Sequence, residues 1–83
     1  MSKFISKEEI FKIIAKSLSI PVKKINEKVS SNNFDEWDSM SHLSILIALD
    51  TKLSGKVQKI QELSEAYSVK RIIQILNKNK LFK

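Results

Sequence analysis

The sequence contains no cysteine and only one glycine and one proline among its 83 residues. The absence of cysteine excludes disulfide bridges and thiolate zinc sites, so any thiol chemistry would need a sulfur atom from a cofactor. Because glycine and proline are the strongest turn signals, their scarcity favours helices over a hairpin-rich β fold. A chain of this length can enclose one modest hydrophobic core, and we expect residues 1–83 to form a single domain.

Long hydrophobic segments are also lacking. The longest uninterrupted apolar run covers residues 45–49, which is far too short to cross a bilayer. The first 14 residues lack the apolar stretch and the small-residue cleavage site of a signal peptide. We therefore expect a cytoplasmic protein with no stable membrane insertion, and we expect it to be a monomer.

Charge is distributed unevenly along the chain. The net charge of +6 at pH 7 would suit a nucleic-acid or anionic-membrane partner. Residues 1–28 carry +4 and residues 52–83 carry +6, whereas residues 29–51 carry −4 and contain no lysine or arginine. A DNA-reading helix should carry the basic residues itself, so the acidic middle segment argues against nucleic acid as the partner. A small basic helical protein that binds nucleic acid or membranes stays open as the alternative from another class.

Capping signals predict the starts of two helices. Ser6 and Glu9 have the spacing of a capping box at the start of a helix over residues 7–19. A second helix is predicted from Ser39 to Leu53, with Asp38 as its N-cap. The residues expected to form its buried apolar face are Met40, Leu43, Leu46, Ile47, Leu49 and Leu53.

The rest of the chain completes an all-α fold. A short helix is predicted over residues 58–64 and a last helix after Ser68, followed by a frayed basic tail at residues 77–83. The expected architecture is a small bundle of three main helices plus one short helix, with a long loop at residues 20–37. The loop residues expected to pack on the core are Val22, Ile25, Val29, Phe34 and Trp37. The buried stripe expected on the last helix is Val69, Ile72, Ile73 and Leu76.

Ser39 stands at the start of the second predicted helix, inside the acidic segment. The first turn of a helix has free backbone N–H groups and the positive end of the helix dipole, so a phosphate ester on this hydroxyl would be stabilised. The long loop before the serine keeps it accessible, and the apolar face after it offers a place to bury an apolar group. These features suit a tethered prosthetic group.

The residues around Ser39 resemble a known family. "DSM" at residues 38–40, opening the second helix of a small helical chain, resembles the D-S-L motif of acyl carrier proteins. "WDSMSHLSILIALD" is similar to the second helix of stand-alone carriers, and "SVKRIIQIL" is similar to their last helix. Met40 replaces the usual leucine, which is a nearly volume-conserving change. The resemblance covers nearly the whole chain.

The resemblance implies that Ser39 is modified with 4'-phosphopantetheine by a phosphopantetheinyl transferase, with Asp38 as helix cap and recognition residue. The cofactor thiol would carry an acyl group as a thioester, in fatty acid biosynthesis or a specialised pathway. The protein would be a carrier rather than an enzyme, and acyl- or aminoacyl-ligases and acyltransferases would be its further partners. Methionine at this motif position also occurs in D-alanyl carriers, so an aminoacyl carrier of the D-alanyl or peptidyl type stays open.

The resemblance also implies a partner-recognition surface. Its expected members are Asp35, Glu36, Met40, Ser41, Ser44, Asp50 and Thr51. Typical fatty-acid carriers have acids along this helix, whereas Ser41, Ser44 and Thr51 are uncharged here. We therefore expect a poor match to general fatty-acid synthase enzymes and a narrower set of partners.

An acyl-chain pocket follows from the same resemblance. Its expected lining is Met40, Leu43, Ile47, Ile60 and Ile72, all of which we expect first of all to be core residues.

The residues around Ser39 also allow interpretations other than a carrier. Ser39 and His42 have the i, i+3 spacing of a hydrolytic pair, but no third group orients the histidine, and we expect His42 at the helix surface or rim. Trp37 is expected to anchor the loop rather than stack on a ligand. No metal site is expected, and an unmodified interaction module is a third interpretation.

Overall fold

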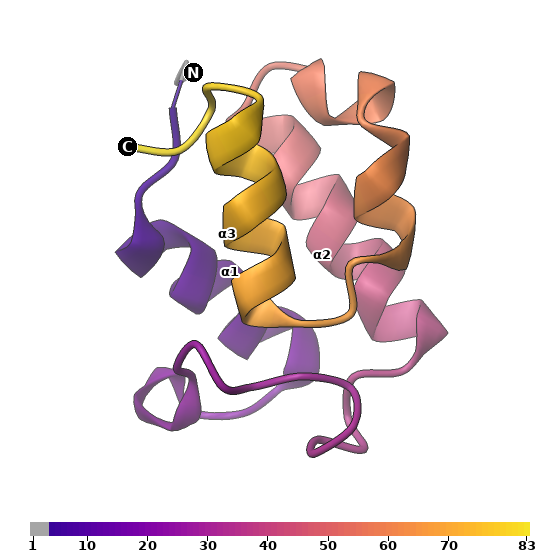
Figure 1. The fold of residues 1–83 in the computed structure, drawn as a ribbon. Coiled ribbons are helices and arrows are strands. Elements are labelled where there is room, and N and C mark those ends of the chain that lie inside the picture. The colour runs from indigo at the N-terminus through magenta and orange to yellow at the C-terminus, as the bar shows by residue number, and fades with distance from the viewer. Residues whose placement is uncertain (1–3) are drawn as a thin grey trace.

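Three α-helices and three short 3-10 helices follow one another along residues 4–83, the part of the chain that the computed structural model describes (Figure 1). The α-helices are α1 (Lys7–Leu18), α2 (Ser39–Lys52) and α3 (Val69–Lys78). The 3-10 helices are η1 (Val22–Lys24), η2 (Lys56–Lys59) and η3 (Gln61–Glu65). Within these described residues, β structure is limited to isolated bridges. The expected all-α class is confirmed.

The start of α1 is fixed by the predicted capping box. The Ser6 hydroxyl accepts a hydrogen bond from the Glu9 backbone N–H at 3.2 Å, and the Glu9 carboxylate accepts one from the Ser6 N–H at 3.0 Å. The same carboxylate forms an ion pair with Lys52 at the end of α2. The Lys52 contact, followed by the Ser6 N–H bond, holds the pKa of Glu9 below its ordinary value. Glu9 therefore both caps α1 and ties it to α2.

The short helix expected over residues 58–64 is replaced by η2 and η3. Their i→i+3 hydrogen bonds include Ile60 N–H to the Val57 carbonyl at 2.9 Å and Leu63 N–H to the Ile60 carbonyl at 3.2 Å. A 3-10 helix has three residues per turn, so residues spaced by three share one face. Val57, Leu63 and Ala66 are buried and Ile60 is half-buried. This apolar spacing of three explains why 3-10 turns replace the expected helix.

The long connection between α1 and α2 packs part of its own apolar content against the core. Ile25, Val29 and Trp37 are buried, as expected. Phe34 is half-buried, also in line with the expectation. Val22 is exposed, because it lies in the surface turn η1. The expectation for Val22 is therefore wrong.

Backbone hydrogen bonds pin the middle of this loop to the start of α3. The Val69 N–H donates to the Val29 carbonyl at 3.0 Å, and the Ser31 N–H donates to the Tyr67 carbonyl at 2.9 Å. In Figure 1 the loop passes beside the first turn of α3. The segment that leads to Ser39 is thus held at its middle by the fold.

The C-terminal residues do not fray, contrary to the expectation for residues 77–83. Leu81 is buried, and its carbonyl accepts a hydrogen bond from the Ile5 N–H at 2.8 Å. The Lys83 N–H in turn donates to the Ile5 carbonyl at 3.0 Å. Figure 1 shows the C-terminal segment beside the first described residues of the chain. A single buried leucine among lysines and asparagines does not form a repeating apolar pattern. The sequence pattern therefore does not indicate that Leu81 is packed.

One hydrophobic core joins the three α-helices. Its largest fully buried side chains are Ile5, Ile10, Ile14, Ile45, Leu49, Leu53, Leu63, Ile72, Ile75, Leu76, Val29 and Val69. The predicted stripe of α3 is confirmed at Val69, Ile72 and Leu76, whereas Ile73 is only half-buried and Ile75 takes its place. Within residues 4–83, no helix has the length and apolar content needed to cross a membrane.

The capping box predicts a clear stability effect. Ser6→Ala should lower the free energy of unfolding by about 1 kcal/mol, because it removes the acceptor of the Glu9 N–H. Ser44→Ala is the matched control: this serine is exposed inside α2, and alanine has the higher helix propensity, so no loss is expected. Urea denaturation followed by circular dichroism measures both variants. An unchanged midpoint for Ser6→Ala would contradict the role of this cap.

The buried C-terminal leucine predicts a second effect. Leu81→Ala should destabilise the fold by about 2 kcal/mol or more, the usual cost of deleting a buried leucine side chain. Leu43→Ala removes the same atoms from a residue that is 53% exposed, so a change within about 0.5 kcal/mol is expected. The same denaturation assay compares the two variants. Equal effects would show that the C-terminal segment is not packed as described.

Candidate functional site

Ser39 is the first residue of α2 and is exposed. Asp38 is the N-cap, as predicted, and its carboxylate accepts a hydrogen bond from the Ser41 N–H at 2.9 Å. The Asp38 carbonyl accepts the first helical bond, from the His42 N–H at 2.9 Å. The helix start is therefore fixed by its own cap, and the serine beside the cap is accessible to a modifying enzyme.

The electrostatics around Ser39 have two components. The Ser41 N–H bond holds the pKa of the Asp38 carboxyl below its ordinary value, so this group is ionised at neutral pH. Asp35 and Glu36 are exposed and add two carboxylates just before the cap. The N-terminus of α2 adds the positive end of the helix dipole, which stabilises an anion bonded to the serine. An acidic surface and an anion-stabilising helix end therefore meet at Ser39.

α2 buries a different face from the one expected. Its buried residues are His42, Ile45 and Leu49. Met40, Leu43 and Ile47 are 74%, 53% and 59% exposed, so the expectation that they belong to the core is wrong. Residues 43–49 are apolar at all but one position, so the apolar pattern alone does not distinguish the two sides of this helix.

Met40, Leu43 and Ile47 instead form an exposed apolar strip, since positions spaced by three and four lie on one side of a helix. Among the other expected recognition residues, Ser44 and Thr51 are exposed, and Ser41 and Asp50 are half-buried. Residues 39–49 contain no Asp, Glu, Lys or Arg. The surface that follows Ser39 along α2 is therefore free of these charges as far as Asp50, and one side of it is the apolar strip.

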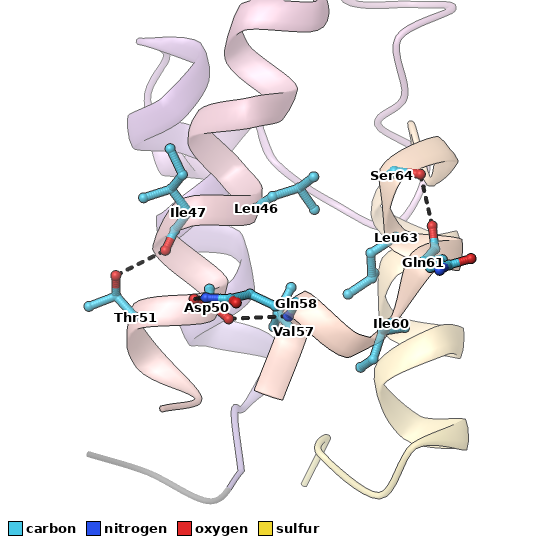
Figure 2. Close-up of a pocket in the computed structure, with 10 residues that line it drawn as sticks. All are labelled: Leu46, Ile47, Asp50, Thr51, Val57, Gln58, Ile60, Gln61, Leu63 and Ser64. Carbon is cyan, nitrogen blue, oxygen red and sulfur yellow. Dashed lines mark hydrogen bonds between the residues drawn. The ribbon is translucent and has the colours of Figure 1, made fainter. Parts of the chain in front are cut away.

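A groove of about 570 Å³ lies between the second half of α2 and the η2–η3 segment (Figure 2). Its apolar lining is Leu46, Ile47, Val57, Ile60 and Leu63. Its polar lining is Asp50, Thr51, Gln58, Gln61 and Ser64. Figure 2 shows Leu46 of α2 and Leu63 of η3 pointing toward each other from opposite walls. The volume is in the range of small-molecule sites.

A polar contact links the two walls of the groove. The Asp50 carboxylate accepts hydrogen bonds from the Gln58 side-chain amide at 3.0 Å and from the Gln58 N–H at 3.3 Å. On α2, the Thr51 hydroxyl donates to the Ile47 carbonyl at 3.0 Å. Asp50 thus fixes η2 against α2 while its apolar neighbours line the groove.

The expected acyl-pocket residues lie in different places in the structure. Ile47 and Ile60 line the groove. Ile72 is fully buried in the core, and the exposed Met40 and Leu43 lie outside the groove lining. Groove residues that the sequence interpretation missed include Leu46, Val57 and Leu63. Val57 and Leu63 could have been found from the apolar residues that are spaced by three after Gly55.

His42 is buried, with 3% exposure, so the expectation of a surface or rim position is wrong. Its Nδ1 accepts a hydrogen bond from Trp37 Nε1–H at 3.0 Å, and its Nε2 lies 2.8 Å from the Leu63 carbonyl oxygen. Trp37 is equally buried and anchors the loop, as expected. Because both ring nitrogens have partners, neither is left for the Ser39 hydroxyl, and the hydrolytic pair is not formed.

Comparison of the chain with protein-family models, curated proteins and solved structures finds no match. Among residues 4–83, no group of three His, Cys, Asp or Glu side chains is placed to hold a metal ion. The features of the described residues that bear on function are Ser39, the acidic residues before it, the apolar strip and the groove.

Proposed function

We propose that this chain is an acyl carrier protein, which carries an acyl group as a thioester on 4'-phosphopantetheine attached to Ser39. The observation that supports this most strongly is the exposed Ser39 at the first position of α2, directly after the capping Asp38. The all-α architecture and the "DSM" sequence at this helix start agree with the proposal.

The residues near Ser39 fit such a group. A phosphodiester on its hydroxyl would lie at the positive end of α2, where the helix dipole would stabilise it. The groove lining starts at Leu46, seven residues along the same helix, which is about 10 Å at 1.5 Å per residue. When bound, the group supplies a thiol, which this cysteine-free chain lacks.

The chain's own residues have distinct roles in this proposal. Asp38 orders the helix start and, with Asp35 and Glu36, presents a negative surface to a phosphopantetheinyl transferase. Ile47 and Ile60 contribute apolar surface for the cargo in the groove. The groove lining also contains Asp50 and other polar side chains. An aminoacyl cargo therefore stays open beside a simple acyl cargo.

The surface of α2 supports a specialised set of partner enzymes. A partner enzyme that docks on the apolar strip buries apolar area, which is worth about 25 cal/mol per Å². It does not form ion pairs between a basic patch and the strip. Ser44 and Thr51, which would hold acids in typical carriers, are exposed and uncharged. Ligases and acyltransferases that serve this carrier should therefore present apolar rather than strongly basic docking surfaces.

Covalent modification tests the attachment site. Co-expression with a broad-specificity phosphopantetheinyl transferase should add one phosphopantetheinyl unit, measured as intact mass. Ser39→Ala should gain none while keeping its helical circular dichroism, and Ser44→Ala should be modified like the wild type. Modification of Ser39→Ala at another serine would contradict the assignment. The additional mass of a loaded thioester then separates acyl from aminoacyl cargo.

Added negative charge on the recognition surface tests partner choice. Ser44→Glu combined with Thr51→Glu should raise the rate of loading by a malonyl-transferring enzyme with a basic docking patch by about two- to thirtyfold, since each exposed charge contact is worth about 0.2–1 kcal/mol. The gain should shrink with added salt. The isosteric Ser44→Gln, Thr51→Gln variant is the neutral control. Equal loading of the Glu, Gln and wild-type proteins would refute the idea that missing negative charge on this surface limits loading by enzymes with a basic docking patch.

A further inference from the structure

His42 joins three segments that surround the proposed site. Trp37, in the loop just before Ser39, donates its indole N–H to His42 Nδ1 at 3.0 Å. On the other side, His42 Nε2 meets the Leu63 carbonyl of η3 at 2.8 Å. The Tyr67 ring packs on the imidazole with a centroid distance of 4.2 Å. The proposed function uses none of these contacts.

The two hydrogen bonds fix the protonation state of the ring. An indole N–H can only donate, so His42 Nδ1 must be unprotonated to accept from Trp37. Nε2 then carries the proton and donates it to the Leu63 carbonyl. Protonation of Nδ1 would place two N–H donors against each other. Protonated His42 and the Trp37 bond therefore exclude each other.

The surroundings of the ring favour the neutral form. Burial lowers the pKa of His42 from its ordinary value of 6.5, and the Leu63 carbonyl bond opposes this effect only in part. Tyr67, from the segment before α3, is the titratable side chain that packs on it. Among residues 4–83, no carboxylate forms an ion pair with the ring.

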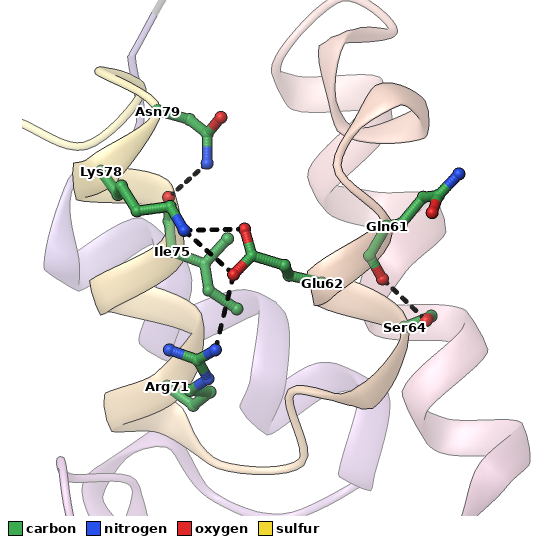
Figure 3. A network of polar contacts seen from close by, with 7 residues as sticks. All are labelled: Gln61, Glu62, Ser64, Arg71, Ile75, Lys78 and Asn79. Carbon is green, nitrogen blue, oxygen red and sulfur yellow. Dashed lines mark hydrogen bonds and ion pairs between the residues drawn. The ribbon is translucent and has the colours of Figure 1, made fainter.

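Leu63 connects the histidine to the wall of the groove. Leu63 and the next residue, Ser64, line the groove, and the Leu63 carbonyl also accepts the Ala66 N–H at 3.2 Å. The outer side of η3 is held through Glu62, whose carboxylate lies 3.0 Å from Lys78 Nζ and 3.5 Å from Arg71 on α3 (Figure 3). These ion pairs are exposed, and exposed pairs contribute little. The buried His42 bond is therefore the stronger anchor of this wall.

We infer that His42 is a positioning residue that couples the loop end presenting Ser39 to the η3 wall of the groove. Neutral His42 holds both through Trp37 and Leu63, and mild acid releases the Trp37 side, while Nε2–H keeps its bond to the Leu63 carbonyl. The link to cargo rests on the proposed function, whereas the coupling itself belongs to the unmodified protein.

The sign of the pH effect follows from the lowered pKa. As the pH falls below 6.5, the unfolded chain binds a proton at His42 before the folded one does. The stabilisation by neutral His42 is therefore complete above the unfolded pKa of 6.5 and decreases as the pH falls toward the folded pKa. Loosening of the site and loss of stability should occur in the same window.

The chain contains one histidine and one tryptophan, so NMR reads the coupling in the unmodified protein without overlap. The His42 ring should titrate with a midpoint below 6.5, and the Trp37 indole N–H signal should shift with the same midpoint. The hydrogen-exchange protection factor of the Trp37 amide, which donates to the Phe34 carbonyl, should fall by roughly tenfold below that midpoint, because the loop end is released. The Ala66 amide, whose acceptor is the Leu63 carbonyl, should keep its protection. Trp37→Phe should raise the midpoint toward 6.5, since it removes the donor that only the neutral ring accepts. Tyr67→Phe keeps the stacked ring and should leave the midpoint unchanged.

A second measurement reads the site in the carrier form. An environment-sensitive fluorophore, attached to Ser39 through the pantetheine arm, should change its emission at the His42 midpoint, and this change should be absent in Trp37→Phe, which has no indole bond to lose. A His42 midpoint at or above 6.5, or an indole signal that does not follow it, overturns the coupling. Emission of the wild-type carrier that is insensitive to this midpoint overturns the link to the proposed site. Failure of Ser39 to accept the arm counts against the proposed function, while the titration of the unmodified protein still supports or overturns the coupling.

Discussion

The imidazole of His42 needs two hydrogen-bond partners in the interior, and the positions of these partners set the rotation of α2 about its axis. A buried polar group without partners is costly, so the ring is stable only where the Trp37 indole and the Leu63 carbonyl both reach it. With His42 inside, Ile45 and Leu49 enter the core on the same side of the helix. The apolar strip of Met40, Leu43 and Ile47 is then left in solvent. The burial of His42 thus explains why α2, which is apolar on both sides, exposes the side that carries the apolar strip.

The same rotation shapes the groove and the helix start. Leu46 and Ile47 lie at the edge between the buried and exposed sides of α2, where they form one wall, and the 3-10 turns of η2 and η3 form the other. Such turns have poorer hydrogen-bond geometry than an α-helix and occur in short pieces. A wall built from them is a low-stability element, of the kind from which binding regions are drawn. The rigid α2 carries Ser39 at one end, so in the proposed carrier the attachment point is fixed while the opposite wall can adjust to cargo.

Local signals in the sequence predicted the ends of the helices well. Ser6, Asp38 and Ser68 each accept a backbone N–H three residues on, because capping depends on side chains adjacent in sequence. The buried face of α2 was not predictable in this way, since His42 reads as polar and its partners Trp37 and Leu63 are supplied by other segments. The packing of Leu81 was missed for the same reason, because it depends on hydrogen bonds to Ile5 at the opposite end of the chain. The position of Ser39 at the start of α2 was predicted because its signal is a helix cap. The groove was only partly predicted because it is a tertiary feature.

The surfaces around Ser39 separate two kinds of recognition in the proposed carrier. Asp35, Glu36 and Asp38 lie before the serine and act at long range, since charge complementarity mainly raises the rate of encounter and excludes unsuitable partners. The apolar strip lies after the serine and acts only on contact, where apolar burial is roughly proportional to area and is not screened by salt as charge pairs are. Lys52, which could have extended a charged surface at the far end of α2, is instead paired with Glu9 of α1. A modifying transferase can therefore be guided by the acidic side, whereas an enzyme that handles the cargo must match the shape of the strip. This division follows from the rotation of α2, because turning the strip inward would leave only the acidic side for both tasks.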